Sequence, residues 1–374
     1  MILTQEQQML RDAVRQYARA HLAPNAAAWD RDGTFPREAL KGLAAMGLYG
    51  VAIAEEWGGA GMDHTALALA LEEIAAGDGA TSTIVQVNNL AADILAGYGS
   101  AAQKESYLKP LARGELLGAF ALTEPHTGSD ASAIRTRAER RGDAWVLDGV
   151  KQFITSGKHA NLAIVFAVTD RNAGKKGISA FVVPTATPGY IVARIEEKTG
   201  QHASDTAQVV LEGCRIPAAN LLGTEGGGYR IALANLESGR INVAAQSVGM
   251  AQSAFEAALK YAHERSTFGK PIIEHQAVSF RLADMATGIE AARQLYLHAA
   301  TLRDRGLPCL KEASMAKLFA SETAEKVCSD AIQIHGGYGY LRDFPVERIW
   351  RDVRVTQIYE GASDIQRMVI GRSL

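Results

Sequence analysis

The pattern of apolar residues along this chain changes character twice, and this change constrains the fold more than any single motif does. Residues 1–117 have helical spacing punctuated by Gly and Pro, residues 118–226 hold short apolar runs, and residues 227–374 return to the helical period. We expect three domains over these ranges: α-helical, all-β and again α-helical. A chain of 374 residues is also long for a single hydrophobic core.

Short motifs and apolar runs place the elements within these blocks. Thr4 and Gln7 have capping-box spacing, which predicts that the first helix starts close to residue 1. Phe35 and Pro36 begin a helix that Gly47 ends. Further helices are predicted over 66–77, 83–98, 101–114, 228–264, 275–304 and 311–334, and strands over 162–169, 178–184, 189–195 and 207–213.

Two further signals concern a turn and a helix start. Asp148-Gly149 divides residues 144–155 into two strand-like runs, which is the strongest short signal for a β-hairpin. Ser363 and Gln366 have capping-box spacing and predict a helix from there to Leu374. We therefore expect a tight turn at the Asp-Gly pair and a capped helix near the C-terminus.

The composition excludes several classes of protein. With 47% hydrophobic residues, 21% charged residues and a net charge of −2, the chain lacks the basic excess of a general nucleic-acid binder. Its three cysteines are far apart, which predicts a reduced interior and no metal site. No apolar run has the length of a membrane span, and the N-terminus lacks signal- and transit-peptide features. We expect a cytoplasmic protein, or a mature form from the mitochondrial matrix.

Five polar motifs each have an ordinary and a functional interpretation. Singly, each is better explained as a turn, a strand end, a helix end or a surface ion pair. Functionally, they would supply donors for a cofactor, a place for a flat heterocycle, or a cation for a pyrophosphate. A G-x-G-x-x-G fingerprint after a strand is absent. The motifs are TEPHTGSD (123–130), QFITSG (152–157), LESGR (236–240), ERSTFGKPIIEHQ (264–276) and QIHGGYGY (333–340).

The stretch IYEGASDIQ (358–366) places Glu360 between Tyr359 and Gly361, just before the predicted last helix. The ordinary explanation is a solvated acid, because the dipole of a helix favours negative charge at its N-terminus. For an isolated glutamate that explanation is sufficient. A catalytic role requires support from the rest of the chain.

In this order, and on this helical–β–helical plan, the motifs resemble those of the acyl-CoA dehydrogenase family over essentially the whole chain. The resemblance implies an α+β multidomain fold: an N-terminal helical domain, a middle β-barrel and a C-terminal four-helix bundle. It also implies an FAD cofactor and a homotetramer built as a dimer of dimers. VNN (87–89) and LARGELLGAFALTEP (111–125) are most similar to the short-chain members.

Position by position, the resemblance implies contacts with FAD that come from two neighbouring subunits. Thr123 and Ser129 would meet the flavin and its phosphates, Phe153 would stack beside the ring, and Thr155 would hydrogen-bond its hydride-accepting edge. The full set of implied FAD contacts is Phe120, Leu122, Thr123, Gly128, Ser129, Phe153, Ile154, Thr155, Arg265, Thr267, Phe268, His275, Gln276, Gln333, Ile334, Gly336, Gly337, Ala362, Ser363 and Asp364.

The same resemblance implies that Glu360 is the catalytic base, and that Ser129, Glu237, Arg240, Tyr359 and Gly361 bind the acyl-CoA. Removing a weakly acidic α-proton requires a carboxylate aimed at it in a dry pocket, where desolvation raises its pKa. In the family, the backbone N–H of the base and a ribityl hydroxyl of FAD stabilise the enolate oxygen. The β-hydride goes to the flavin, and the electrons then pass to an electron-transfer flavoprotein.

Several positions depart from the family pattern. Ala362 replaces a common Thr, His126-Thr127 replaces a smaller pair, and His335 stands where an apolar residue is usual and is expected to have a packing role. Some relatives carry the base at the position of Gly239, which leaves Glu360 as the candidate here.

The substrate class follows partly from a missing cation. The segment GATSTIVQVNN (79–89) has no Arg or Lys, which disfavours a dicarboxylyl substrate such as glutaryl-CoA and leaves short straight or branched acyl groups. Two alternatives remain: an oxidase or desulfinase-like relative on the same fold, and a non-catalytic acyl-CoA-binding protein.

Overall fold

The first block is helical in the structure, a computed structural model that describes residues 2–374. The first helix, α1, starts at the predicted capping box: the Gln7 N–H donates to Thr4 Oγ1 at 3.2 Å, and the Thr4 N–H donates to Gln7 Oε1 at 3.0 Å. The predicted long helices are α4 and α5, and both are almost completely buried. The block comprises α1 (Gln5–Tyr17), α2 (Ala23–Asp32), α3 (Arg37–Ala45), α4 (His64–Gly77), α5 (Gly79–Tyr98), α6 (Ala101–Gln103) and α7 (Lys109–Ala112).

The middle block forms one eight-stranded sheet. Its strands pair in the order β6-β7-β3-β2-β4-β5-β8, and β1 pairs in parallel with β4. The four strands predicted from apolar runs are β4 to β7, so those predictions are confirmed. The strands are β1 (Gly118–Ala121), β2 (Arg137–Arg141), β3 (Ala144–Thr155), β4 (Leu162–Val168), β5 (Ile178–Pro184), β6 (Tyr190–Ile195), β7 (Thr206–Pro217) and β8 (Leu221–Leu222).

The predicted hairpin turn at Asp148-Gly149 is wrong. Strand β3 continues through this pair, and the register of its pairing with β7 shifts there as at a β-bulge. The turn lies earlier, at Gly142 and Asp143 between β2 and β3, and Gly142 has the positive φ (65°) that a tight turn favours. Gly149 is needed for a different reason: an added Cβ would lie 2.7 Å from the Thr136 Cα atom.

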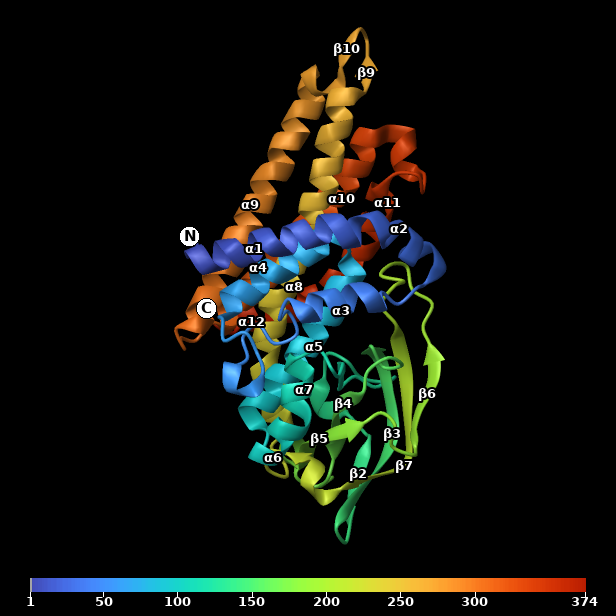
Figure 1. The fold of residues 1–374 in the computed structure, drawn as a ribbon, viewed down its shortest axis with the longest axis vertical. Coiled ribbons are helices and arrows are strands. Elements are labelled where there is room, and N and C mark those ends of the chain that lie inside the picture. Colours follow the sequence, from blue (N-terminus) through green and yellow to red (C-terminus); the bar gives the residue numbers. More distant parts are fainter. Residues whose placement is uncertain (1) are drawn as a thin grey trace.

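The last block is a group of long helices, and its predicted boundaries agree with the structure within a few residues. Three of them, α8 (Gly228–Glu264), α9 (Gln276–Asp304) and α10 (Leu310–His335), run side by side along the tall axis of the molecule (Figure 1). A short hairpin of β9 (Ser266–Thr267) and β10 (Lys270–Pro271) forms the tip. The shorter α11 (Pro345–Val353) and α12 (Ser363–Gly371) complete the block.

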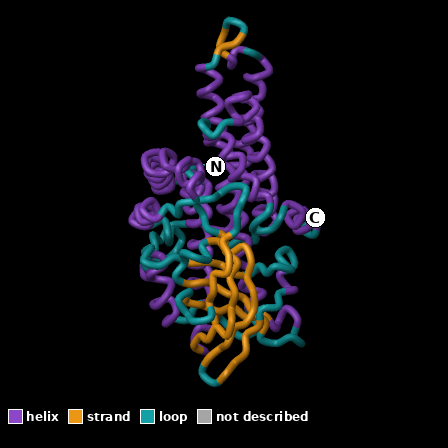
Figure 2. The backbone as a smooth tube through the Cα atoms, turned by 90° about the vertical axis from the view of Figure 1, so that its right-hand side faces the viewer, coloured by secondary structure: helices purple, strands orange, loops and turns teal. Residues whose placement is uncertain are grey.

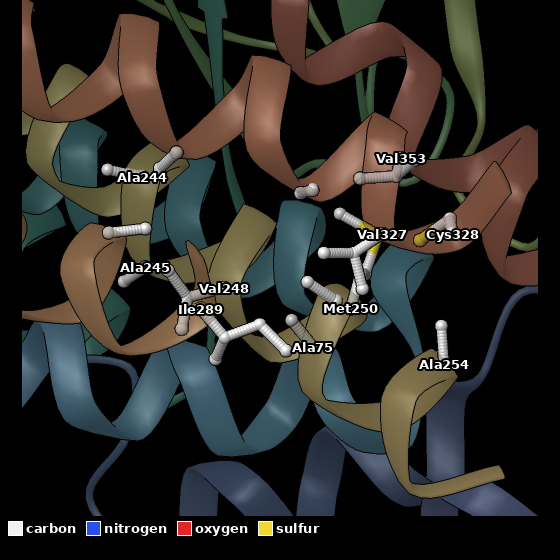
Figure 3. Close-up of a cluster of buried hydrophobic side chains, with 14 of the residues drawn as sticks. Ala75, Ala244, Ala245, Val248, Met250, Ala254, Ile289, Val327, Cys328 and Val353 are labelled. Carbon is white, nitrogen blue, oxygen red and sulfur yellow. The ribbon is translucent and has the colours of Figure 1, made fainter. Parts of the chain in front are cut away.

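The tip and the sheet lie at opposite ends of the molecule (Figure 2). Between them, α8 packs against α4, α9 and α10, and the small side chains of these helices allow close packing (Figure 3). Ala244, Ala245, Val248, Ile289 and Val327 belong to this core. The helical–sheet–helical order expected from the sequence is confirmed. Of the helices formed by residues 2–374, none has both the length and the apolar character needed to cross a membrane.

Candidate active site

Glu360 lies in a short loop between α11 and α12, and the loop has an unusual backbone. Glu360 has a φ of 52° and Gly361 a φ of 91°. Residues other than glycine rarely adopt a positive φ, and such a conformation persists when its surroundings hold it in place. Two side chains hold it here: Lys317 Nζ donates to the Gly361 carbonyl at 2.7 Å, and Gln366 Nε2 donates to the same oxygen at 2.8 Å.

The predicted capping box at Ser363 and Gln366 is wrong. Ala362 is the N-cap of α12 and makes no side-chain capping bond, while Ser363 is already helical. Gln366 instead turns its amide back to the carbonyls of Glu360, at 3.3 Å, and Gly361. The helix also ends at Gly371, before the predicted Leu374. The amide of Gln366 thus holds the loop that carries Glu360.

The carboxylate of Glu360 packs against α8 at Gly239. A Cβ added to Gly239 would lie 2.6 Å from Glu360 Oε2 and 3.0 Å from its Cδ, so the missing side chain provides the space for the carboxylate. Oε2 is buried and makes no hydrogen bond with residues 2–374. The Glu360 N–H likewise makes no backbone hydrogen bond within the described chain. The loop therefore presents a free acceptor and a free donor together.

Burial controls the protonation of this carboxyl. Desolvation raises the pKa of Glu360 above that of an ordinary glutamate. Gln86, Lys317 and Arg240 act in the opposite direction, because each favours the charged carboxylate. A base with a raised pKa binds a proton more strongly once it has taken one.

Behind the carboxylate, polar side chains close the space between α5 and α8. Gln246 lies two helical turns beyond Gly239 on the same face of α8 and is fully buried. Its Oε1 accepts from the Tyr359 hydroxyl at 3.0 Å, and its Nε2 donates to Ser82 at 3.2 Å. Gln86, on α5, is buried beside Glu360. The site therefore ends in a wall of buried polar side chains close to the carboxylate.

The two predicted acyl-CoA residues on α8 do not form the surface ion pair that was the alternative explanation. Arg240 is buried and donates from Nη1 to Ser314 Oγ at 3.2 Å. Burial lowers the pKa of Arg240, although Glu360 and Glu237 favour its charged form. Glu237 is half-buried, and its Oε2 lies 3.6 Å from Cys309 Sγ.

The middle-domain sheet contributes two neighbouring segments, the loop after β1 and the end of β3. A hydrogen bond joins them: the Gln152 N–H, on β3, donates to the Thr123 carbonyl, in the loop, at 2.9 Å. Phe153 is 62% exposed although it is aromatic, and it has a φ of 60°. Its ring is thus available to a ligand. The predicted contacts on this side are Phe120, Leu122, Thr123, Gly128, Ser129, Phe153, Ile154 and Thr155; the side chains of Leu122 and Ile154 are buried in the core.

A buried ion pair organises this loop. Lys151 Nζ lies 2.8 Å from Glu124 Oε1, and both side chains are almost fully buried. Glu124 also accepts from the N–H groups of Arg135, at 2.6 Å, and Thr136, at 2.9 Å. Because all these partners are present, the carboxylate fixes both ends of the loop that contains Ser129.

The other predicted FAD residues lie at the far end of α8, and Arg265, Thr267, Ile334, Gly336 and Gly337 among them line a hollow of about 420 Å³. Arg265 lies over the Tyr338 ring at 5.9 Å, and a Cβ added at Gly336 or Gly337 would meet no atom within 4 Å. His335 has the expected packing role, because it stacks on Tyr261 at 4.4 Å. The predicted contacts at this end are Arg265, Thr267, Phe268, His275, Gln276, Gln333, Ile334, Gly336 and Gly337.

The two sets of predicted FAD contacts are far apart within one chain. Gly239, which packs against Glu360, lies on α8, and Arg265 caps the C-terminal end of the same helix. At a rise of 1.5 Å per residue, the two residues are roughly 40 Å apart. Ala362, Ser363 and Asp364 follow the Glu360-Gly361 pair and belong to the near set. Figure 1 shows the same separation between the tip and the sheet. The predicted FAD contacts of one chain therefore fall into two separate groups, a near half-site beside Glu360 and a far half-site at the end of α8, if both bind FAD as predicted.

Sequence reasoning missed three side chains beside Glu360: Lys317, Gln366 as a loop anchor, and Gln86. The signal for Lys317 was available, since it interrupts the small and apolar face of EASMAKLFAS (312–321). No comparable signal marks Gln86 or the backward turn of Gln366. Within residues 2–374 no cluster of His, Cys, Asp or Glu is arranged to hold a metal ion.

Comparisons with known proteins agree along the whole chain. Sequence models of the acyl-CoA dehydrogenase N-terminal, middle and C-terminal domains match residues 4–115, 119–214 and 226–374. The mitochondrial short-chain specific acyl-CoA dehydrogenase of Mus musculus is 46% identical, over all of this chain and 90% of that protein.

Two solved structures have the same fold. Butyryl-CoA dehydrogenase from Megasphaera elsdenii superposes with a TM-score of 0.98 at 41% identity, over all of this chain and 99% of its own. A chain solved in work on the electron transferring flavoprotein of Acidaminococcus fermentans has a TM-score of 0.99 at 44% identity, covering all of this chain and 98% of its own.

Proposed function

The chain belongs to the acyl-CoA dehydrogenase family of FAD-dependent oxidoreductases, and on that premise we propose that it dehydrogenates a short straight- or branched-chain acyl-CoA to the trans-2-enoyl-CoA. Glu360 takes the α-proton in this proposal. The observation that carries it is the buried Oε2 of Glu360, which makes no hydrogen bond with residues 2–374 and lies on a loop held by Lys317 and Gln366.

The state of Glu360 suits proton abstraction from a weak carbon acid. Burial raises the pKa of the carboxyl, and the nearby cations Lys317 and Arg240 still favour its ionised form. The free N–H of Glu360 lies on the same loop and can donate to the thioester oxygen as negative charge develops there. Glu237 and Arg240, on the neighbouring α8, are proposed to bind the CoA chain, with Tyr359, Gly361 and Ser129.

Several residues of the two half-sites fit FAD. Phe153 exposes its ring beside Thr155, Ser363 has a buried hydroxyl oxygen without a partner in the described chain, and the hollow near Arg265 is open at Gly336 and Gly337. A cation and open backbone suit a pyrophosphate, and an exposed aromatic suits a flat ring. When bound, FAD supplies the acceptor for the hydride that leaves Cβ.

A short acyl group is favoured by the wall behind Glu360. Tyr359 and Gln246 fill this region with hydrogen-bonded polar groups, and Gln86 adds a buried side-chain amide. A long alkyl chain would have to displace these groups and break their hydrogen bonds, at a cost of unpaired polar atoms. A dicarboxylyl tail would need a free cation. The two cations beside the Glu360 carboxylate already donate hydrogen bonds to other groups. Lys317 donates to the Gly361 carbonyl, and Arg240 donates to the Ser314 hydroxyl.

We propose two partners. Electrons pass to an electron-transfer flavoprotein, as the resemblance implies and as the setting of one structural neighbour supports. The second partner is another copy of this chain, in a homotetramer of the family type. The separation of the two half-sites supports this assembly, because roughly 40 Å exceeds the length of a single FAD molecule.

The test is anaerobic flavin reduction. Mixing the yellow protein with butyryl-, isobutyryl-, isovaleryl-, octanoyl- and glutaryl-CoA should bleach the flavin with one or two of the short substrates. Glu360→Gln should retain FAD and acyl-CoA binding but bleach about 10²- to 10⁴-fold more slowly, because a general base is lost. Glu264→Gln, an exposed glutamate at the end of α8, is the matched control.

Other outcomes separate the alternatives. Full activity in Glu360→Gln contradicts the assignment of the base, and bleaching that is strongest with octanoyl- or glutaryl-CoA contradicts the short-chain preference. Rapid peroxide formation in air would indicate an oxidase. A protein that remains colourless after incubation with FAD would indicate a non-catalytic acyl-CoA-binding protein.

A further inference from the structure

We infer that Lys317 is a positioning residue for the reaction: its ammonium group fixes the Gly361 carbonyl, and with it the carboxylate of Glu360, and its charge keeps that carboxylate ionised. This inference rests on the proposed function, in which Glu360 is the base. It assigns a role to a side chain that the reaction itself does not require.

The contacts of Lys317 are unusual for a lysine. The residue lies on α10 and is fully buried, and its Nζ donates to the Gly361 carbonyl at 2.7 Å. A buried ammonium group is costly unless it is paired and hydrogen-bonded. The contact therefore joins the middle of a long helix to a loop that comes 44 positions later in the chain.

Satisfying the carbonyl alone would not require this lysine. Gln366 Nε2 already donates to the Gly361 oxygen at 2.8 Å, so the carbonyl would keep a partner if Lys317 were apolar. A leucine or methionine at this place would also avoid the cost of burying a charge. The lysine adds a second, charge-assisted hydrogen bond and a cation close to Glu360.

The charges around Lys317 come from three elements. Glu360, on the loop, and Glu322, on α10, favour its charged form, whereas Arg240, on α8, opposes it. Burial has the largest effect and lowers the pKa of Lys317 to about 7. The groups that act on Glu360 are the cations Lys317 and Arg240 and the amide of Gln86, on α5. Lys317 and Glu360 therefore bias each other towards their charged forms.

A mutual bias of this kind predicts a bell-shaped pH profile. The rate of α-proton removal should rise as Glu360 ionises, and it should fall above about pH 7 as Lys317 loses its proton. Without the lysine, the falling limb should disappear. The rising limb should also move to higher pH, because one of the groups that favour the carboxylate is gone.

Three variants of the FAD-loaded enzyme separate geometry from charge. Lys317→Met loses both the hydrogen bond to Gly361 and the positive charge. Its kcat should fall by about 10- to 100-fold while the affinity for acyl-CoA changes little. Lys317→Gln can still donate to Gly361 but has no charge, so its kcat should be intermediate and its falling limb should be absent. In Lys317→Ala, added propylamine should restore part of the rate, whereas propan-1-ol should not.

The control is Lys326→Met on the same helix, because the Lys326 side chain is 71% exposed and pairs only with Asp330 among the described residues. It should leave kcat and the pH profile unchanged. A readout independent of the flavin is exchange of the α-hydrogen of a bound acyl-CoA with D₂O, which should slow in parallel with kcat in the Lys317 variants.

Two results would overturn the inference. One is a Lys317→Met enzyme that keeps the kcat and the pH profile of the wild type. The other is loss of FAD or of folding in all three variants without rescue by propylamine, which would make Lys317 structural. If no acyl-CoA bleaches even the wild type, the proposed function itself has failed; a wild type that turns over leaves that function intact whatever the Lys317 variants do.

Discussion

At the scale of single residues, the space at Gly239 controls where the carboxylate can lie. In Gly239→Ala the new methyl group would lie 2.6 Å from Glu360 Oε2, and the end of a flexible side chain can move away at little cost. We expect kcat to fall by about 10²-fold, because a displacement near 1 Å costs this much in a positioned catalytic group. Thermal unfolding should change little, and the two measurements together identify a catalytic rather than a structural effect.

A matched glycine on α5 gives the comparison for this substitution. A Cβ added at Gly97 would meet no heavy atom within 4 Å, so Gly97→Ala should leave kcat unchanged. Because Gly97 itself is an exposed position of this otherwise buried helix, the alanine should stabilise the protein by about 0.5–1 kcal/mol, as alanine usually does relative to glycine. If Gly239→Ala retained the wild-type kcat in a folded protein, the carboxylate would not act from the position described above.

The role of a residue could be predicted from the sequence where the residue belongs to a recognisable motif. It could not be predicted where folding alone brings the residue to the site. Glu360 stood out because its motif has a family resemblance. Gln86 reaches the site from α5, and Lys317 from α10, through packing that joins segments far apart in the sequence. A lysine on a helix is ordinarily solvated, so its burial depends on a loop 44 positions away.

At the scale of elements, the long helices were predictable because their period repeats over many turns. The prediction of 228–264 coincides with α8, because this stretch has no proline and keeps the helical period over many turns. Short signals were less reliable. Asp148-Gly149 is a hairpin signal only if both flanking strands pair with each other, and here Asp148 pairs across to Arg137 on β2. Capping at Ser363 failed because Gln366 bonds to the carbonyls of Glu360 and Gly361 instead.

The role of Gly149 within β3 can be tested by the stability of the sheet. In Gly149→Ala the added Cβ would lie 2.5 Å from Thr136 Oγ1 and 2.7 Å from Thr136 Cα, so the backbone of a neighbouring segment would have to move. We expect a loss of about 1–3 kcal/mol in the free energy of unfolding, measured by urea denaturation. Gly371→Ala, where an added Cβ meets nothing within 4 Å, is the control. An unchanged midpoint for Gly149→Ala would mean that the close approach to Thr136 is absent in solution.

At the scale of the whole molecule, the proposed assembly requires two copies of the chain for one complete site, because the predicted FAD contacts fall into two separated half-sites. Glu360, Phe153 and Ser363 lie in the near half-site, and Arg265 and the glycines at 336–337 lie roughly 40 Å away at the far end of α8. In a symmetric dimer, each site would combine the near half of one copy with the far half of the other. Each site then needs an intact near half-site and an intact far half-site, and a defect in either one inactivates that site.

This arrangement predicts complementation between two defective chains. Glu360→Gln and Arg265→Ala chains should each be nearly inactive at limiting FAD, but a mixed dimer has one site built from the intact halves of both. Random reassembly should therefore restore about a quarter of the wild-type activity, since half of the dimers are mixed and one site in each is intact. Mixing Glu360→Gln with the double variant Glu360→Gln/Arg265→Ala restores nothing, because neither chain supplies the base. If the first mixture also restored nothing after verified subunit exchange, FAD would bind within a single chain, and the far hollow would have to be assigned another ligand.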